Sequence, residues 1–191
     1  MARIAAETAR LRLRDWGDGD RDSFYAIMNT PAVMEHLGGV QTPAGWDAAY
    51  QRIVGFTRDH GHTFWIVEDK VLGEMLGFCG LKRVNAPGTH DLGGEMEVGW
   101  RLRESAWGKG IAREAAIASL DLAFGKFAAP HVIAMTTAAN VASQRLMERL
   151  GMVRRADLDF TDTRFGAELN PQMIWRIDAA DWPAARATAS A

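Results

Sequence analysis

The sequence predicts a single mixed α+β domain with a central sheet of about six to seven strands, flanked by about four helices. The main observation is the order of β-favouring and helix-favouring segments, which is β-α-α-β-β-β-α-β-α-β-β. This order describes an antiparallel meander that leads into two strand–helix units. The second observation is that 191 residues with 48% hydrophobic content can bury one core without a disulfide or a metal.

The first half of the chain supplies the beginning of the meander. Leu11 and Leu13 alternate with arginines, so a half-buried strand is expected over Ala9 to Arg14. Thr42 followed by proline is a typical N-cap and first helical position, which predicts a helix from there to about His60. The other elements expected here are a helix from Asp20 or Asp22 to Met28, a helical turn over Pro31 to Leu37, strands over Thr63 to Val67 and Met75 to Val84, and a loop over Asn85 to Gly94.

The second half supplies the two strand–helix units and the last strands. A segment from Ile111 to Lys126 is rich in Ala, Leu and Ile and apolar on nearly every side, as expected of a helix buried against a sheet. A shorter helix starts after Asn140, a good N-cap, and ends before Gly151, a good C′ residue. Strands are expected over Met96 to Leu102, His131 to Thr136, Val153 to Phe160 and Gln172 to Ile177, with a loop over Thr161 to Asn170.

A glycine-broken loop connects the central strand to the long apolar helix, and it reads Trp107-Gly108-Lys109-Gly110-Ile111-Ala112-Arg113. The first turn of a helix has backbone N–H groups without partners and a partial positive charge, which together favour an anion. The two glycines lack a Cβ and would let a pyrophosphate approach the backbone, while Lys109 and Arg113 add positive charge at the rim. The sequence contains neither a dinucleotide fingerprint nor a P-loop. A tight turn into a core helix explains this loop, taken alone, about equally well.

The segment from Asn140 to Met152 changes the interpretation of this loop. It reads N-x-x-S-x-x-x-x-x-R-x-G-M, and Gly108 to Ala112 reads G-x-G-I-A. This pair of motifs resembles the GNAT superfamily of acetyl-CoA-dependent N-acetyltransferases, in which a Q/R-x-x-G-x-G/A loop after a strand precedes such a helix. Ser105 stands where the first motif usually has Gln or Arg, so one rim contact lacks its usual residue. The resemblance covers about Thr8 to Ile177, and Thr8 to Arg14 is similar to the branch that acetylates ribosomal-protein N-termini.

The resemblance implies a fold in which the central strands splay apart and the pantetheine arm of acetyl-CoA lies between them. It implies no metal. The cofactor-binding residues that it implies are Trp100, Arg101, Leu102, Trp107, Gly108, Lys109, Gly110, Ile111, Ala112, Arg113, Asn140 and Ser143. Gly99, inside the strand, is expected to mark either a β-bulge that frees backbone groups for the pantetheine amides or close packing against Trp100 or Trp107.

Acyl transfer from a thioester to an amine requires a group that accepts the amine proton. Glu97 is the first candidate for this general base, because it lies on the strand that enters the phosphate loop, where the family often has a base. Glu95, on the same face of the strand, is the second candidate, and Asp91 lies in the preceding loop. The alternative is that all three are solvated surface acids.

The leaving thiolate has fewer candidate partners. Many family members have a tyrosine seven positions after the motif asparagine, but Met147 stands there and cannot donate a proton. Ser143 has a hydroxyl that could protonate or hydrogen-bond the sulfur, or that could instead bond to its own helix carbonyl. A thiolate with a pKa of about 8.5 can also leave unprotonated.

These residues predict an acetyl-CoA-dependent N-acetyltransferase that moves an acetyl group directly to a primary amine, either a protein N-terminus or a small molecule. The alternative is an acyl-CoA-binding or sensor module with little or no turnover.

A formal charge of −2 without a basic block disfavours nucleic-acid and membrane partners. The single Cys79 fits a cytoplasmic location and has no activating neighbour, and His60 and His62 lack a third metal ligand. We expect one domain over residues 1–191, with its core at about 8–178 and a frayed end at 183–191; a homodimer is left open.

Overall fold

The computed structural model describes residues 2–189, which form a single sheet of eight strands with six α-helices around it. The strands are β1 (Ile4–Glu7), β2 (Leu11–Arg14), β3 (Phe64–Asp69), β4 (Met75–Arg83), β5 (Met96–Leu102), β6 (His131–Thr136), β7 (Val153–Arg154) and β8 (Met173–Asp178). The helices are α1 (Asp20–Met28), α2 (Pro31–Met34), α3 (Pro43–His60), α4 (Ile111–Gly125), α5 (Val141–Arg149) and α6 (Trp182–Ala189). The mixed α+β class is therefore confirmed, with slightly more strands and helices than expected.

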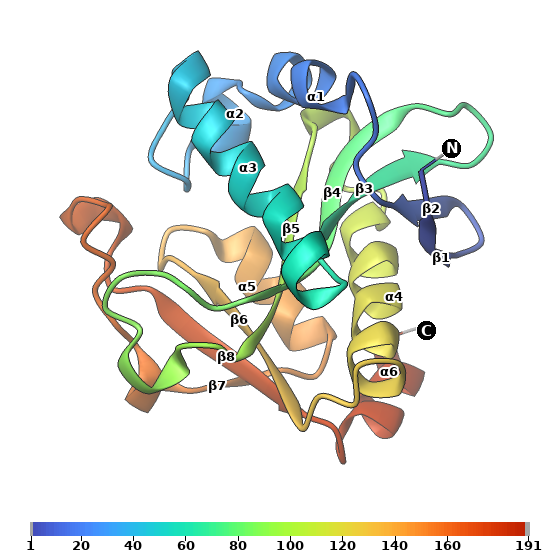
Figure 1. The fold of residues 1–191 in the computed structure, drawn as a ribbon. Coiled ribbons are helices and arrows are strands. Elements are labelled where there is room, and N and C mark those ends of the chain that lie inside the picture. Colours follow the sequence, from blue (N-terminus) through green and yellow to red (C-terminus); the bar gives the residue numbers. More distant parts are fainter. Residues whose placement is uncertain (1, 190–191) are drawn as a thin grey trace.

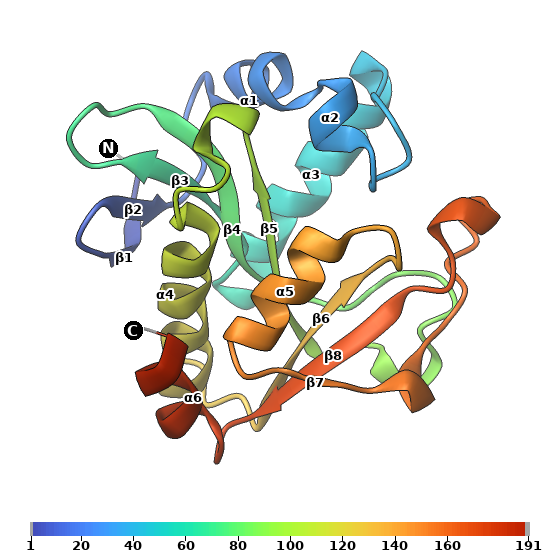
Figure 2. The same ribbon diagram turned by 180° about the vertical axis from the view of Figure 1, so that it is seen from behind.

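Helices cover both faces of the sheet. Helices α1, α2 and α3 lie over one face, and α4, α5 and α6 lie over the other, as the two opposite views show (Figures 1 and 2). Aromatic side chains fill the layer under α1 and α3, where Phe24 stacks on both Trp46 and Phe78. A larger aliphatic core lies between the sheet and α4, which buries alanines such as Ala115 and Ala116. The apolar sides of α4 thus face the sheet, as the composition of that helix predicts.

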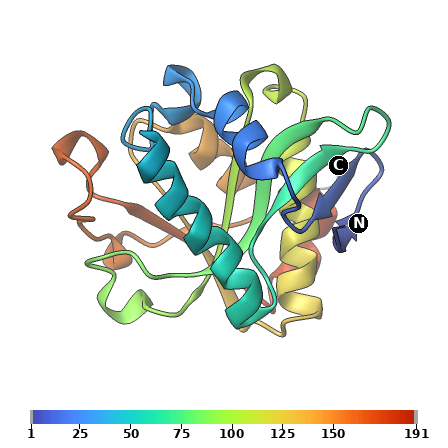
Figure 3. The same ribbon diagram turned by 45° about the horizontal axis from the view of Figure 1, so that its top comes forward.

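The central strands separate after one pairing position. The strands run in the order β1-β2-β3-β4-β5-β6-β8-β7, and every neighbouring pair is antiparallel except β5 and β6. Between these two fully described strands the only paired position is Glu97 with Ile133, whereas β5 pairs with β4 along its whole length. Helix α5 lies beside the resulting gap (Figure 2), and α3 crosses the opposite face (Figure 3). The expected splay of the central strands is confirmed.

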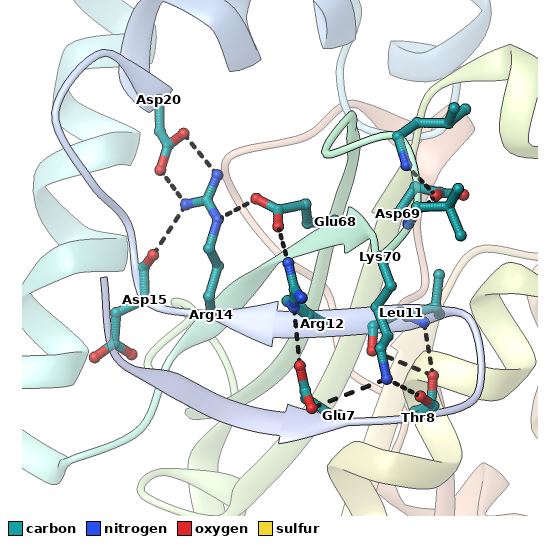
Figure 4. Close-up of polar contacts among 12 residues, drawn as sticks. Glu7, Thr8, Leu11, Arg12, Arg14, Asp15, Asp20, Glu68, Asp69 and Lys70 are labelled. Carbon is teal, nitrogen blue, oxygen red and sulfur yellow. Dashed lines mark hydrogen bonds and ion pairs between the residues drawn. The ribbon is translucent and has the colours of Figure 1, made fainter. Parts of the chain in front are cut away.

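A network of charged side chains attaches the N-terminal strands to the rest of the sheet (Figure 4). Arg14 on β2 donates from Nη1 to Asp20 Oδ2 at 2.6 Å and from Nε to Glu68 Oε2 at 2.7 Å. The hydrogen bonds with Asp20 are the main reason that the pKa of the Arg14 guanidinium is raised, since they outweigh its partial burial. Arg12 on the same strand pairs with Glu7 of β1 at 2.8 Å. The arginines predicted for this strand therefore join β1, β2, β3 and α1.

The segment after Gly151 differs from the expected strand over Val153 to Phe160. Only Val153–Arg154 pairs as a strand, and a short 3₁₀ helix over Ala156–Leu158 follows before Phe160 bridges to Gln172. The physical reason is that the Asp159 side chain takes the place of a backbone partner for β8. Its Oδ1 accepts a hydrogen bond from Ile174 N at 3.0 Å. Arg154 holds the same carboxylate through Nη1 at 2.6 Å.

The end of the chain also differs from expectation, because residues 183–189 belong to helix α6 and are not frayed. Trp182 is buried against Phe124 of α4, with ring centroids 5.8 Å apart. Its indole Nε1 donates to Asp121 Oδ1 at 3.0 Å, and Arg186 donates to the same oxygen at 2.7 Å. Residues 190 and 191 lie outside the described part. None of the helices between residues 2 and 189 is both long and apolar enough to span a membrane.

Candidate active site

A cavity of about 290 Å³ lies where β5 and β6 separate. One wall comes from β5 and β6 and from α5, and the other comes from α3 and the loop that follows α2. The segment over 161–172 closes one side. The lining residues used below are Arg52, Phe64, Phe78, Lys82, Glu97, Gly99, Trp100, Arg101, Asn140, Ser143, Met147, Asp162, Arg164 and Phe165.

The glycine loop has the backbone geometry expected of an anion site. Gly108 and Gly110 both adopt the left-handed conformation, with φ of 71° and 74°, and α4 begins directly afterwards without a side-chain N-cap. In the described chain, no acceptor takes the N–H groups of residues 111–113. A Cβ at Gly108 would meet nothing within 4 Å, so the space above the loop is open. The first turn of α4 therefore presents free N–H donors and the positive end of the helix dipole.

The N-terminal strands hold this loop in place through Glu114, in the first turn of α4. Thr8 Oγ1 donates to Glu114 Oε1 at 2.5 Å, and Arg10 Nε donates to Glu114 Oε2 at 2.6 Å. Arg10 also reaches the loop itself, because its Nη1 donates to the carbonyl of Lys109 at 3.0 Å. Burial raises the pKa of the Glu114 carboxyl, but the hydrogen bonds from Thr8 and Arg10 outweigh burial and hold it below its usual value.

The backbone of β5 presents alternate residues to the gap between β5 and β6. Arg103 N donates to Leu76 O and Val84 N donates to Glu95 O, both at 2.9 Å, so the odd-numbered residues of β5 bond to β4. The N–H and C=O groups of Val98, Trp100 and Leu102 consequently point towards β6. The Leu102 carbonyl accepts a hydrogen bond from Trp107 Nε1 at 2.8 Å. The pairing of Glu97 with Ile133 uses the Met96 carbonyl and the Val98 N–H. This leaves the Val98 carbonyl and the backbone of Trp100 to bond the amides of an extended ligand in the gap.

Gly99 does not form a β-bulge, so that expectation is wrong. The register between β4 and β5 is unbroken from Met96 to Leu102. The glycine is required by close packing, because a Cβ at this position would lie 2.8 Å from the ring of Phe64. The packing partner is thus Phe64 and not one of the two tryptophans considered. The backbone groups that face the gap are free because the strands diverge.

The α5 motif places a hydroxyl beside the gap. Asn140 Oδ1 accepts from Ser143 N at 3.1 Å, which confirms the predicted N-cap. Ser143 Oγ accepts a hydrogen bond from Trp100 Nε1 at 3.3 Å. Within residues 2–189 this hydroxyl does not donate to a carbonyl of its own helix, so the alternative role considered for it is not realised and its proton is free to be donated. Met147 is buried and lines the same cavity.

Glu97 is the only one of the three candidate acids that lines the cavity. Its side chain is buried, which contradicts the surface alternative for this residue, and its Oε2 lies 2.5 Å from Lys82 Nζ on the facing strand. The contact is an ion pair without hydrogen-bond alignment. Glu95 instead pairs with His131 at 2.5 Å, and Asp91 is exposed on a 3₁₀ turn; neither lines the cavity.

A second ion pair lies beside the first. Asp162 is buried in the loop over 161–170 and accepts from Arg164 Nε at 2.9 Å and from Arg164 Nη2 at 2.5 Å. Burial raises the pKa of the Asp162 carboxyl, but the hydrogen bonds and positive charge of Arg164, with a smaller effect from Lys82, outweigh burial and lower it. We refer to Lys82, Glu97, Asp162 and Arg164 as the charge cluster.

Comparison with known proteins places this chain in a family. The model of the GNAT acetyltransferase domain matches residues 10–153. The chain belongs to the GNAT acetyltransferase family. It is 31% identical over 158 residues to YkkB of Bacillus subtilis, a protein of uncharacterised function. The matched segment covers 79% of this chain and 86% of the relative.

Solved structures of GNAT proteins share the fold. A GNAT-family acetyltransferase from Bordetella pertussis has a TM-score of 0.76 at 22% identity, over 91% of this chain and 99% of that one. Spermidine N-acetyltransferase from Vibrio cholerae, solved in complex with CoA and spermine, has a TM-score of 0.70 at 18% identity, over 92% of this chain and 99% of that one. At these identities the likeness concerns the fold alone.

The GNAT motif residues fall into two groups in the structure. Trp100, Arg101, Asn140 and Ser143 line the cavity, whereas the loop over residues 107–113 lies outside its lining, at the start of α4.

The remaining residues that were considered for chemistry lie outside this cavity. The Cys79 thiol is buried beside Ser119 Oγ at 3.6 Å, and burial raises its pKa to about 12, which disfavours the reactive thiolate. Among residues 2–189, no group of three or more potential ligands could hold a metal ion.

Several cavity residues were missed by the sequence reasoning. Lys82 faces Glu97 directly in the antiparallel pair, so a register argument for the predicted strands could have found it. Asp162, Arg164 and Phe165 come from a loop without regular structure, and no periodicity signals their position. Trp16, Trp46, Trp65 and Trp175 do not line the cavity and pack in the core clusters, as tryptophans more often do.

Proposed function

We propose that this protein is an acetyl-CoA-dependent N-acetyltransferase that transfers the acetyl group directly from the thioester to a primary amine. The observation that carries the proposal is one cavity, at the separation of β5 from β6, lined by a buried carboxylate, Glu97, and by the Ser143 hydroxyl, whose oxygen accepts from Trp100 and whose proton is uncommitted. Family membership supports the acetyltransferase class. A cytoplasmic location, expected from the single cysteine, belongs to the same proposal.

The cofactor fits two sets of backbone donors. The free N–H groups of residues 111–113 suit the pyrophosphate, and the rim charges of Lys109 and Arg113 are placed to support it. The Val98 carbonyl and the backbone of Trp100 face the gap and suit the pantetheine amides. The thioester then lies near Trp100, where a β5 N–H polarises its carbonyl oxygen as an oxyanion donor.

The charge cluster supplies the base. An ammonium group has a pKa of about 10.4 in lysine and about 7.7–8.0 at a chain terminus, so the acceptor must lose a proton before it attacks. Glu97 accepts that proton directly or through one water, and the amine nitrogen then bonds to the thioester carbon. The carbon–sulfur bond breaks as the carbonyl re-forms, and the Ser143 hydroxyl donates a hydrogen bond to the departing sulfur. The Lys82 ammonium lies 2.5 Å from the Glu97 carboxylate and balances its negative charge in the site.

The alternative of an acyl-CoA-binding or sensor module is less well supported. The residue that favours a sensor is Met147, because it cannot donate a proton to the leaving thiolate. Ser143, one helical turn away, has a hydroxyl that can act as the donor instead. A thiol-release assay with acetyl-CoA and a panel of amines separates the two functions. Amine-dependent release of CoA thiol is expected from an enzyme, whereas a sensor binds acetyl-CoA by calorimetry and releases no thiol with any amine.

The acceptor class is the finer part of the proposal and includes protein N-termini and small amines. The stretch Thr8 to Arg14, which resembles the branch acting on ribosomal proteins, contacts the phosphate loop and the neighbouring strand and does not line the cavity. It therefore favours neither class of acceptor. The residues that select the acceptor are those on the α1–α3 side of the cavity.

Ser143→Ala is expected to lower turnover roughly two- to twelvefold, the effect of losing one hydrogen bond of about 0.5–1.5 kcal/mol. The affinity for acetyl-CoA should change less, because the bond matters most when the sulfur gains charge. Trp100→Phe is the matched variant, since it leaves the hydroxyl in place and removes only its indole donor. Stopped-flow or steady-state turnover at saturating substrates checks this. Equal rates for Ser143→Ala and the wild type, with chemistry rate-limiting, would remove Ser143 from the mechanism.

A further inference from the structure

Arg101 carries a half-buried positive charge that no side chain neutralises. It lies on the same face of β5 as Glu97 and Gly99, and its guanidinium carbon lies 5.2 Å from the centroid of the Phe78 ring. Its Nε is buried without a hydrogen-bond partner, and across residues 2–189 its side chain makes no ion pair. Burial lowers the pKa of this guanidinium to about 10, so it remains charged at neutral pH. A charge that is partly withdrawn from water without a partner is costly, which makes such a group a candidate for binding an anion.

The other charges of the cavity do not offset Arg101. Lys82 pairs with Glu97 and Arg164 pairs with Asp162, so both acids of the charge cluster are already engaged. Arg52 of α3 also lines the cavity and has no ion pair within the described part of the chain. Four cationic and two anionic side chains therefore line a cavity in a protein whose formal net charge is −2. The excess of positive charge is local to this site.

The position of Arg101 separates it from the phosphate loop. Its partner on β4 is Phe78, which stacks on Phe24 of α1 with centroids 5.3 Å apart. The neighbouring residue Trp100 faces the other side, because its partner Cys79 contacts Ser119 of α4. The Arg101 guanidinium thus lies on the α1–α3 side of the sheet, whereas the free N–H groups of the loop belong to α4 on the opposite side. It belongs to the acceptor half of the cavity.

We propose that the acceptor is a small molecule that carries both a primary amine and a carboxylate, an amino acid or a close relative, and that Arg101 binds its carboxylate. This inference rests on the proposed function and deepens it. The planar guanidinium matches a carboxylate with two parallel hydrogen bonds. A polyamine would instead place further positive charges beside Arg101 and Arg52, and like charges oppose binding.

The size of the cavity favours a small acceptor. Its volume of about 290 Å³ lies at the lower limit of small-molecule pockets, which span roughly 300–1,000 Å³. One side is closed by contact between the segment after α2 and the loop over 161–170, because a Cβ at Gly38 would lie 3.1 Å from the Phe165 ring. This closure leaves room for an amino acid at the thioester more readily than for an extended polypeptide.

The test compares ligands that differ only in the carboxylate. The common L-amino acids and their amides are titrated into protein saturated with CoA, and the same pairs are then assayed with acetyl-CoA. Tighter binding of at least one acid over its amide, by roughly ten- to hundredfold, is expected for a charge-assisted contact. The binding arm does not depend on turnover. Binding selectivity without acetylation would remove the proposed function and keep the carboxylate site, whereas acetylation without selectivity would overturn the carboxylate site alone.

Two substitutions assign the contact to Arg101. Arg101→Met keeps an unbranched chain over Phe78 without the charge, and it should raise KM for the acid far more than KM for the amide. Arg101→Lys keeps the charge without the two-bond geometry and should restore part of the selectivity. Thermal unfolding confirms that each variant is folded. A loss of acetyl-CoA affinity with unchanged selectivity, an equal loss in Arg52→Met, or a preference for spermidine over every amino acid would overturn the assignment.

Discussion

Replacing Glu97 with glutamine is expected to lower turnover by about 10²–10⁴, the usual contribution of a positioned general base. Glutamine has nearly the same size and can still hydrogen-bond, but it cannot accept a proton at neutral pH. The affinity for acetyl-CoA should hardly change, because the expected pyrophosphate contacts lie at the start of α4. The loss should shrink as pH rises towards the pKa of the acceptor amine, since more of the amine then arrives deprotonated. Turnover measured against pH for both proteins checks the prediction.

The Lys82 ion pair requires a control for this experiment. Glu97→Gln alone leaves the Lys82 ammonium half-buried without its anion, which itself destabilises the site. The double variant Glu97→Gln with Lys82→Met lacks the base but has no uncompensated cation, so it should be folded and equally slow. Wild-type rates in either folded variant across neutral pH would disprove the role of Glu97.

Gly110→Asp is expected to weaken acetyl-CoA binding by roughly ten- to hundredfold for each charge-assisted hydrogen bond that is lost, since such bonds contribute about 1.5–3 kcal/mol. The aspartate places a negative charge where the loop presents free N–H groups. A Cβ at this position would lie 3.6 Å from Arg10 Nη2, so the new carboxylate also competes for the arginine that holds the loop. Isothermal titration calorimetry with acetyl-CoA measures the effect.

Gly110→Asn is the matched variant for this prediction. Asparagine has the size of aspartate, and both residues tolerate the left-handed conformation that Gly110 adopts at φ 74°. The difference between the two variants therefore isolates the charge. Equal affinities for both would contradict an anion site at this loop, and so would the absence of binding to folded wild-type protein at millimolar acetyl-CoA.

Elements with local start and stop signals could be predicted from the sequence. Thr42 accepts from Gly45 N, as expected of the N-cap, and α3 ends at His60, as predicted, with Gly61 in a left-handed conformation directly after it. The glycine loop over residues 107–113 and the N-cap of α5 also depend on residues close together in the chain. The β-favouring residues of Met96 to Leu102 placed Glu97 correctly on the strand that enters the loop.

Features that depend on distant side chains could not be predicted. Asp159 replaces part of a strand by accepting from Ile174, and Trp182 secures α6 through Asp121, which is 61 positions away in the sequence. The small residues after Trp182 show no strong local preference, so the tryptophan and its partner decide the outcome. The free charge of Arg101 is similarly invisible in a sequence, because its neighbours on the acceptor side are set by tertiary packing.

The contact between Thr8 and Glu114 joins residues that are 106 positions apart, and it has a thermodynamic consequence. The edge of the sheet and the first turn of α4 are coupled, so a ligand that binds only the ordered loop also stabilises the docked N-terminal strands. By reciprocity, loosening those strands lowers the affinity of the loop for its ligand by the same coupling free energy. The N-terminal edge, although remote from the reacting atoms, is thus a place where changes in sequence can adjust cofactor affinity without altering acceptor choice.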